Sequence, residues 1–344
     1  MIDLNKLVRE NVLKLSPYSS ARDDFKGKTG IFMDANENPY GNLNRYPDPY
    51  QKELKSLISR VKEIEEDKIF LGNGSDEIID LTFRVFCRPG VDKALTFTPT
   101  YGMYEVSASV NDVEVIKVPL NNSFQIDLRK AESQFSDKNL KLVFICSPNN
   151  PTANSMHHKD VEYIVANFSG IVLIDEAYID FSDSPSFINL VNRCSNLIVM
   201  QTFSKAFGLA AARVGMAFLN PKIVQYFNKI KPPYNISTIN QKAALNKLNK
   251  VEEYKSQVTK IKKERKRLSA ILSEMDFAEK VYPSDANFLL VKVKNSSYIY
   301  NALVSKNIII RNRSNLIKDC LRITIGKRNE NDKLIDALRE LCIK

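Results

Sequence analysis

Short runs of aliphatic residues recur between positions 68 and 219 and alternate with stretches whose apolar residues have helical spacing. Unbroken aliphatic runs are typical of strands that are buried on both faces, and strands alternating with helices form largely parallel sheets. In such sheets a ligand binds outside the carboxyl ends of the strands. The predicted strands are 68–71, 94–97, 113–118, 142–145, 171–174, 196–200 and 214–219.

The hydrophobic pattern on either side of this region predicts further elements. Helices are expected at 3–15, 50–62, 223–231, 297–306 and 331–341, with a long helical stretch at 237–273. Strands are expected at the start of 31–41, near 281, and at 288–291, 308–310 and 321–324. This division predicts an N-terminal arm that forms part of a small domain (1–40), a large domain (41–250) and a small C-terminal domain (251–344).

Length and charge narrow the class of protein. A chain of 344 residues is too long for one ordinary core, and 44% hydrophobic with 26% charged residues is typical of a globular protein. The net charge of +10 favours an anionic partner, and nucleic acid is one alternative. However, the basic residues are spread along the chain, and no helix-turn-helix pattern precedes the predicted fold. The densest basic run, Lys260–Arg267, lies in a helical pattern and is typical of a solvated helix face.

Cysteines, histidines and the N-terminus add three expectations. The 5 cysteines are scattered without a Cys-x-x-Cys pair, which predicts reduced thiols in a cytoplasm. His157 and His158 lack cysteines or carboxylates at metal-ligand spacing, so no metal site is expected. The charged N-terminus lacks the apolar core of a signal peptide, and no apolar run reaches membrane-spanning length. A cytoplasmic protein is therefore expected.

Lys205 stands out because it lies among apolar and small residues between the predicted strands 196–200 and 214–219. Burial lowers the pKa of a lysine and makes its free amine available to attack carbonyls, as in Schiff bases with pyridoxal phosphate. Ser204 and Arg213 lie close by in sequence, and the three side chains together suit a phosphate ester. The alternative is an exposed lysine where a loop meets a helix.

Other polar residues follow the predicted strands. The segment Gly72–Glu77 combines two glycines and a serine at a strand-to-helix turn, which suits either a phosphate or an ordinary capped turn. Tyr101 is placed to stack on a planar ring or to pack in the core. Asn149 and Asn150 can donate to a phenolate oxygen, although asparagine before proline is also common in turns.

Asp175 ends the aliphatic run 171–174 and is expected to be nearly buried. A buried carboxylate needs a cation or several donors, and a protonated pyridine nitrogen would serve, although a helix N-cap is the alternative. Tyr178 would then reach the other side of the ring. Arg311 and Arg322 lie at the ends of apolar strands, where they form either an anion clamp or ordinary salt bridges.

Taken together, these motifs resemble the pyridoxal-phosphate aminotransferases of fold type I, the aspartate-aminotransferase-like fold, over nearly the whole chain. Further motifs look like the histidinol-phosphate aminotransferase family, namely Leu15–Arg22, Ala35–Gly41, Arg45–Pro49, Pro99–Tyr104 and Cys320–Thr324. The resemblance implies an α/β fold with a mostly parallel seven-stranded sheet in the large domain and a smaller α+β domain.

The resemblance also implies a reaction. It is amino transfer between L-histidinol phosphate and 2-oxoglutarate, giving imidazole acetol phosphate and glutamate, in L-histidine biosynthesis. A threonine-phosphate decarboxylase, an aromatic amino acid aminotransferase and a DNA-binding regulator of the same fold are the alternatives.

Individual roles follow from the same resemblance. Lys205 would bind the cofactor aldehyde and act as the acid and base, and Asp175 would hold the pyridinium. The phenolate would be held by Tyr178 and Asn150, the ring would be stacked by Tyr101, and the phosphate would be bound by Ser75, Asp76, Ser204 and Arg213. Tyr46 would reach the cofactor phosphate of a partner subunit, which implies a homodimer. The substrate would be bound by Tyr18, Asn38, Arg311 and Arg322.

Two positions depart from the family pattern. Ala153 stands where Asn-Pro-Thr is usually followed by glycine, and Ala210-Ala-Ala precedes Arg213 where a glycine is usual. Each departure adds a methyl group near a cofactor loop and removes no catalytic group.

Overall fold

The computed structural model describes residues 2–18 and 30–342. All of the strands predicted between 68 and 219 are present, and they form one sheet in the order β1-β7-β6-β5-β4-β2-β3. Neighbouring strands are parallel except β7, which runs antiparallel to both β1 and β6. The strands are β1 (Ile69–Asn73), β2 (Lys93–Thr98), β3 (Glu114–Pro119), β4 (Leu140–Cys146), β5 (Ile171–Asp175), β6 (Leu197–Thr202) and β7 (Val214–Leu219).

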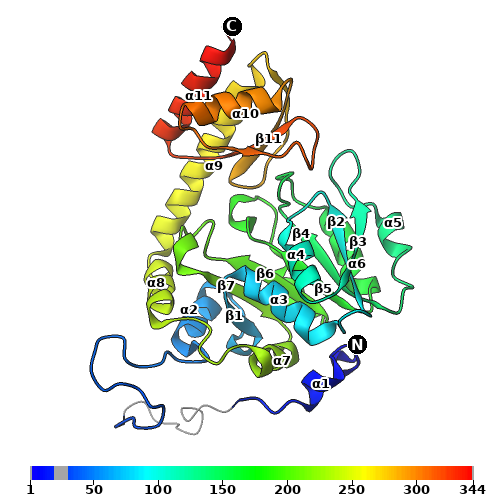
Figure 1. The fold of residues 1–344 in the computed structure, drawn as a ribbon, viewed down its shortest axis with the longest axis vertical. Helices are drawn as coiled ribbons and strands as arrows, with labels where there is room; N and C mark the ends of the chain where they lie inside the picture. Colours follow the sequence, from blue (N-terminus) through cyan, green and yellow to red (C-terminus); the bar gives the residue numbers. More distant parts are fainter. Residues whose placement is uncertain (1, 19–29, 343–344) are drawn as a thin grey trace.

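Helices cover both faces of this sheet, which is why its central strands are buried at nearly every position (Figure 1). One face packs on α3 (Ser75–Phe86), α4 (Met103–Val110) and α7 (Pro221–Ile230). The other face packs on α2 (Lys52–Lys62), α5 (Leu128–Glu132), α6 (His158–Asn167) and α8 (Thr238–Leu248). Short 3-10 helices lie at Glu66–Lys68, Ile179–Phe181, Phe187–Asn192 and Ala210–Ala212.

A smaller antiparallel sheet, in the order β10-β11-β9-β8, forms the second domain at the top of Figure 1. Its strands are β8 (Ala278–Val281), β9 (Phe288–Val293), β10 (Arg311–Asn312) and β11 (Cys320–Thr324). They pack on α10 (Ser296–Ser305) and α11 (Arg328–Cys342). The strand expected at 308–310 is wrong, because pairing with β11 begins only at Arg311.

The helix α9 (Val251–Ser273) connects the two domains. Its first turns bury Tyr254 and Val258 in the core of the large domain, whereas Leu268 and Leu272 belong to the core of the small domain. The long helical stretch predicted over 237–273 is therefore two helices. The proposed domain boundary after residue 250 falls in the break between α8 and α9.

The N-terminal residues pack differently from the prediction. Residues 3–15 form a 3-10 helix, η1 (Leu4–Lys6), and a short helix, α1 (Glu10–Lys14), and not one continuous helix. Their apolar side chains Leu4, Val8 and Val12 are buried in the core that contains α3 and α7. This segment thus belongs to the large domain and not to the small one, because its apolar stripe fits between helices of the large sheet.

The strand expected at the start of 31–41 is also wrong. Ile31 is 95% exposed and Met33 is 90% exposed, and neither pairs with a strand. A short apolar run alone does not distinguish a buried strand from an exposed apolar surface. In Figure 1 the described part of this segment lies away from the body of the chain, at the lower left.

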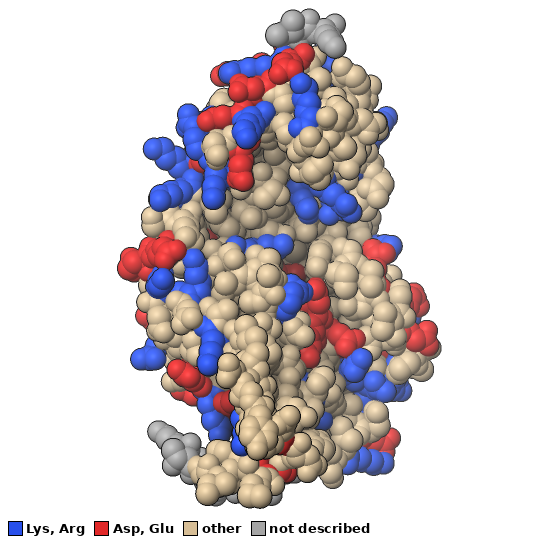
Figure 2. Space-filling model, turned by 60° about the vertical axis from the view of Figure 1, so that its left-hand side comes forward, with Lys and Arg blue, Asp and Glu red and all other residues tan. Residues whose placement is uncertain are grey.

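The basic run Lys260–Arg267 lies on α9, but the prediction of a solvated helix face is wrong for Arg265, which is buried and donates to the carbonyl oxygens of Phe181 and Ala286. Lys262 forms an ion pair with Asp183, and Arg267 contacts Glu264 and Asp332. On the face drawn in Figure 2, lysine and arginine side chains are interspersed with acidic ones and do not form a continuous basic stripe. None of the helices in residues 2–18 and 30–342 is long and apolar enough to cross a membrane.

Candidate active site

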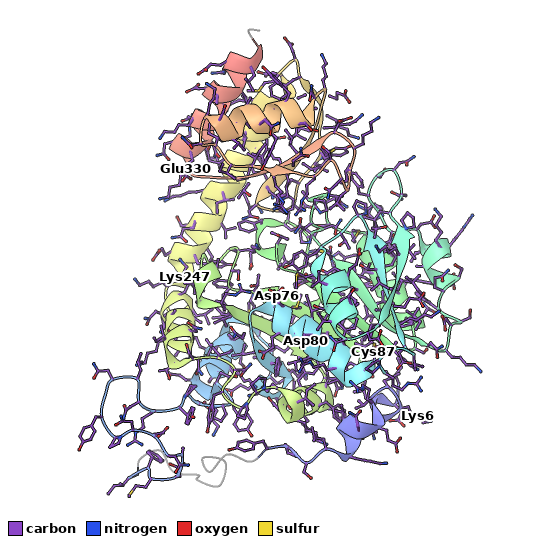
Figure 3. All side chains as sticks on the ribbon, viewed as in Figure 1. Lys6, Asp76, Asp80, Cys87, Lys247 and Glu330 are labelled. Carbon is purple, nitrogen blue, oxygen red and sulfur yellow. The ribbon has the colours of Figure 1, made fainter. Side chains whose placement is uncertain are left out.

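A cavity of about 210 Å³ lies where the carboxyl ends of the large sheet face β11 of the small domain. Because β7 is antiparallel, its first residues lie at the same edge as the ends of β1, β4, β5 and β6. Figure 3 labels Asp76, which lies in the first turn of α3, at the end of the helix that faces the cavity. Ten of the predicted site residues line the cavity, namely Ser75, Asp76, Tyr101, Asn150, Asp175, Tyr178, Ser204, Lys205, Arg213 and Arg322.

Asp175 is the last residue of β5 and is 3% exposed. One carboxylate oxygen accepts a hydrogen bond from the Ala177 N–H at 3.0 Å, and the other accepts one from the Tyr104 hydroxyl at 2.7 Å. Burial raises the pKa of Asp175 to about 6, although the Tyr104 hydrogen bond acts in the opposite direction. The N-cap alternative does not hold, because the next helix begins only at Ile179.

Lys205 follows β6 and lines the same cavity. Its Nζ lies 5.7 Å from the centroid of the Tyr178 ring. The residue is exposed, and not buried as predicted, because the cavity that it lines is open to solvent. Partial burial nevertheless lowers the pKa of Lys205, and the neighbouring Arg322 guanidinium lowers it further. A larger fraction of the amine is therefore unprotonated at neutral pH.

The first turn of α3 provides backbone N–H groups for an anion. Its N-cap, Gly74, has a φ of +77° and no side-chain capping bond. A Cβ atom on Gly74 would lie 2.7 Å from Arg213 Nη2, and one on Gly215 would lie 2.4 Å from the Ser75 nitrogen. The two glycines thus allow the backbone of Ser75 and the guanidinium of Arg213 to approach closely.

Arg213 is held in a left-handed conformation with a φ of +49°. Such strain in a non-glycine residue is typical of functional positions. Its Nη2 donates to Asp76 Oδ2 at 3.1 Å, and its Nη1 lies 3.5 Å from Ser204 Oγ. The other carboxylate oxygen of Asp76 accepts from the Tyr101 hydroxyl at 3.2 Å. Asp76 therefore orients both Arg213 and Tyr101.

These groups fit pyridoxal phosphate. The N-terminus of α3 with Arg213 and Ser204 suits the phosphate, and the buried carboxylate of Asp175 suits a protonated ring nitrogen. The flat face of Tyr101 suits stacking, and the amine of Lys205 suits the aldehyde.

The small domain contributes two arginines to the cavity. Arg322 Nη1 donates to Asn150 Oδ1 at 2.6 Å, and its guanidinium lies 5.3 Å from the Phe288 ring centroid. The buried Nε atoms of Arg313 and Arg322 lack a hydrogen-bond partner among the described residues. Within that part of the chain, neither arginine has a carboxylate within ion-pair distance. Two such guanidinium groups facing one cavity favour an anionic ligand.

Arg311 does not line the cavity, whereas Arg313 does. Arg311 is exposed, and its Cα lies opposite that of Arg322 in the β10–β11 ladder. Its charge is close enough to lower the pKa values of both Arg313 and Arg322. The prediction of an arginine pair is therefore wrong for Arg311, because Arg313, two residues later, is the one that lines the cavity with Arg322.

Three other predicted residues lie outside this cavity in the single chain. The Tyr46 ring stacks on Tyr234, with centroids 4.3 Å apart. Asn38 accepts a hydrogen bond from the Tyr40 N–H, and Tyr18 is 72% exposed. None of the three lines the cavity that contains Lys205. The rest of the Leu15–Arg22 motif, from residue 19 onward, lies outside the described residues.

Comparison with known proteins agrees with this geometry. A family model described as aminotransferase class I and II matches residues 27–338. The chain belongs to this aminotransferase family. Aminotransferases of class I and II are pyridoxal-phosphate enzymes of fold type I, as the cavity and the large sheet indicate.

Several individual aminotransferases are similar to this chain. The histidinol-phosphate aminotransferase of Parabacteroides distasonis is 52% identical over 344 residues, which cover 99% of each chain. The structure of histidinol-phosphate aminotransferase from Clostridium acetobutylicum is similar with a TM-score of 0.80 and 28% identity, covering 87% of this chain and 91% of that one. The Sinorhizobium meliloti enzyme in complex with pyridoxal-5'-phosphate has a TM-score of 0.79 and 24% identity, covering 87% and 84%.

The sequence of this aminotransferase did not single out Tyr104, Cys146, Thr202 or Arg313 as site residues. Cys146 and Thr202 end the strands β4 and β6 and line the cavity. Their position at strand ends could have identified Cys146 and Thr202, because the other site residues were predicted from their positions at strand ends. Tyr104 lies behind the cavity, inside α4, where only its hydrogen bond to Asp175 marks it.

Ala153 occupies a backbone conformation that favours glycine in this aminotransferase. Its φ is +69°, and the residue is fully buried. A Cβ atom in the left-handed region costs about 1 kcal/mol, and relief of this strain offsets the greater flexibility of glycine in the unfolded chain. We therefore expect Ala153→Gly to leave the free energy of unfolding nearly unchanged. Ala243→Gly, in the middle of α8, is the matched control and should lower it by about 1 kcal/mol. Urea unfolding of both variants measures the difference, and an equal loss of stability in the two variants contradicts it.

Proposed function

We propose that this aminotransferase exchanges the amino group of L-histidinol phosphate with 2-oxoglutarate, giving imidazole acetol phosphate and glutamate, in L-histidine biosynthesis. The similarity to the Parabacteroides distasonis enzyme over the full chain supports this substrate. The structural observation that carries the proposal is the pair of guanidinium groups, on Arg313 and Arg322, beside Lys205. Both amino donors, histidinol phosphate and glutamate, have an anionic end for this pair.

Bound pyridoxal phosphate supplies an aldehyde that captures amines and a ring that takes up electrons. The uncapped N-terminus of α3, with Ser75, Ser204 and Arg213, would bind its phosphate. The Asp175 carboxylate would face the ring nitrogen and keep it protonated, because an opposite charge at close range favours the charged form.

Lys205 would first hold the cofactor through its amine and then move a proton to and from the substrate Cα. Its lowered pKa suits this role, since the amine must accept a proton near neutral pH. Arg322, through its hydrogen bond to Asn150 Oδ1, would leave the Asn150 amide free to donate toward the ring phenolate beside Tyr178. In this proposal an acid-base group, an orienting carboxylate and phenolate donors would act together in one cavity.

Arg313 and Arg322 would bind the substrate phosphate in one half-reaction and a carboxylate of glutamate in the other. Arg311 would add positive potential from the neighbouring position of the ladder. We expect Arg322→Gln and Arg313→Gln each to lower kcat/KM for histidinol phosphate by about 10²-fold, because each removes a charge-assisted contact from a desolvated site. Arg339→Gln, on the exposed face of α11, is the matched control and should leave kcat/KM unchanged. Unchanged kcat/KM in both cavity variants contradicts the assignment.

We further propose a homodimer in which Tyr46 reaches the cofactor phosphate of the partner subunit. Its support is the exposed apolar surface of one segment, in which Tyr40 and Leu43 are 83% and 66% exposed beside Ile31 and Met33. Isolated chains rarely leave so many large apolar side chains in water, and a second copy would cover them. Light scattering of the purified protein should give twice the mass of one chain. A fully active monomer contradicts this arrangement.

A cytoplasmic location completes the proposal. The described cysteines Cys87, Cys146, Cys194 and Cys320 are all free thiols, as in reducing compartments. Cell fractionation should recover the protein with cytoplasmic enzymes, and recovery with the membrane fraction contradicts this location.

The substrate is tested with a panel of amino donors. Cofactor-loaded protein is mixed with L-histidinol phosphate, threonine phosphate or phenylalanine, and the visible absorbance of the cofactor and any release of carbon dioxide are followed. We expect the largest kcat/KM for histidinol phosphate, with the absorbance restored by 2-oxoglutarate. Faster reaction with phenylalanine favours an aromatic aminotransferase, and carbon dioxide released from threonine phosphate favours a decarboxylase.

A further inference from the structure

Tyr104 lies directly behind the cavity and contacts its key carboxylate. The residue is 1% exposed within α4, and its hydroxyl donates to Asp175 Oδ2 at 2.7 Å. Its ring stacks on Phe144, with centroids 5.0 Å apart, and meets the Tyr101 ring edge-on at 5.6 Å. Two aromatic neighbours therefore fix the ring, and the ring fixes where its hydroxyl points.

The hydrogen bonds of Asp175 leave little freedom to its carboxylate. The Ala177 N–H occupies one oxygen and the Tyr104 hydroxyl occupies the other. We propose that Tyr104 is a positioning residue that holds Asp175 ionised and oriented toward the ring nitrogen of the cofactor. This inference rests on the proposed cofactor and not on the identity of the amino donor.

The electrostatic surroundings make this hydrogen bond important. Burial and the negative charge of Asp76 raise the pKa of Asp175, while Tyr104, the Ala177 N–H and Lys205 lower it, with a result of about 6. The other titratable groups near Asp175 are the thiol of Cys146 and the phenols of Tyr101 and Tyr178. Burial raises the pKa of Tyr104 well above its ordinary value, so its hydroxyl keeps its proton and remains a donor.

Removing the hydroxyl changes the charge of Asp175 in a predictable direction. Without the Tyr104 donor the pKa of Asp175 rises further, so the carboxylate takes up a proton at a higher pH. A neutral Asp175 no longer attracts a protonated ring nitrogen. Cofactor affinity should therefore begin to fall at a higher pH than in the unmodified protein as the solution is acidified.

The test compares Tyr104→Phe with the matched control Tyr226→Phe, whose hydroxyl contacts Asn5 on the outer surface. Pyridoxal phosphate is titrated into each full-length protein from pH 5 to 9, and the dissociation constant is read from the cofactor absorbance. We expect Tyr104→Phe to bind the cofactor about tenfold more weakly at neutral pH, since hydrogen bonds to charged groups are strong. The acid limb, which is the pH range where cofactor affinity falls as the solution is acidified, should move up by about one pH unit in this variant. The affinity of Tyr226→Phe should match that of the unmodified protein at each pH.

A double-mutant cycle shows whether Tyr104 acts through Asp175. In an Asp175→Asn background, loss of the Tyr104 hydroxyl should no longer shift the acid limb. An unshifted acid limb in Tyr104→Phe overturns the proposal, as does an equal shift in both backgrounds. The readout is cofactor absorbance and needs no amino donor. If the protein binds the cofactor but does not react with histidinol phosphate, the proposed substrate is wrong, while the role of Tyr104 can still be tested.

Discussion

Lys205→Ala should lower kcat for amino transfer by about 10⁴-fold or more, even at saturating cofactor. In the proposed mechanism the change removes both the amine that would hold the aldehyde and the group that would move the proton at the substrate Cα. The phosphate site and Asp175 are untouched, so the variant should still bind the cofactor without covalent attachment. Steady-state rates and the visible spectrum of the loaded protein measure both effects.

The control for this variant is Lys222→Ala, at the exposed start of α7. It removes the same side chain at a distance from the cavity and should leave kcat and the spectrum unchanged. Retained transamination in Lys205→Ala removes the central claim about the cavity, whatever the similarity to other aminotransferases.

Asp175→Asn should lower kcat by about 10³-fold, the second largest effect. The amide keeps the shape of the side chain but removes the negative charge that stabilises a protonated ring nitrogen, and removal of one such preorganised group commonly costs about 10²- to 10³-fold. The rate with histidinol phosphate at saturating cofactor measures the loss.

Glu176→Gln separates this effect from a general loss of stability. Glu176 is the adjacent residue and is also fully buried, but it does not line the cavity. Its carboxylate accepts hydrogen bonds from the Ser186 hydroxyl, the Phe187 N–H and the Gln201 amide. Its substitution should lower the melting temperature and leave the turnover of each folded molecule nearly unchanged. Equal losses of turnover in the two variants contradict a specific role for Asp175.

The large sheet was predictable because its strands are unbroken aliphatic runs that end in polar residues. Parallel strands bring their carboxyl ends to one edge, so Lys205, Asp175 and Asn150 were expected together and lie together. Arg213 joins them because β7 is antiparallel and begins at the same edge. The polar residues at strand ends were sufficient to predict this part of the site, because the sheet brings the ends of its strands close together.

The remaining parts depend on contacts that no local pattern reports. The choice between Arg311 and Arg313 depends on where β10 begins, and the apolar run 308–310 placed that strand too early. Tyr104 reaches Asp175 across 71 positions, through packing against Phe144. The apolar residues Leu4, Val8 and Val12 predict a buried face but do not say which core covers it, so packing on the large domain was not deducible from spacing alone.

The most direct measurement maps the covalent attachment site of the cofactor. The loaded protein is reduced with borohydride, digested, and searched by mass spectrometry for a peptide carrying the pyridoxyl group. The cavity geometry predicts one modified lysine, Lys205. The same protein without added cofactor is the control and should carry no pyridoxyl group. A pyridoxyl group on any other lysine, or none after loading, contradicts the account.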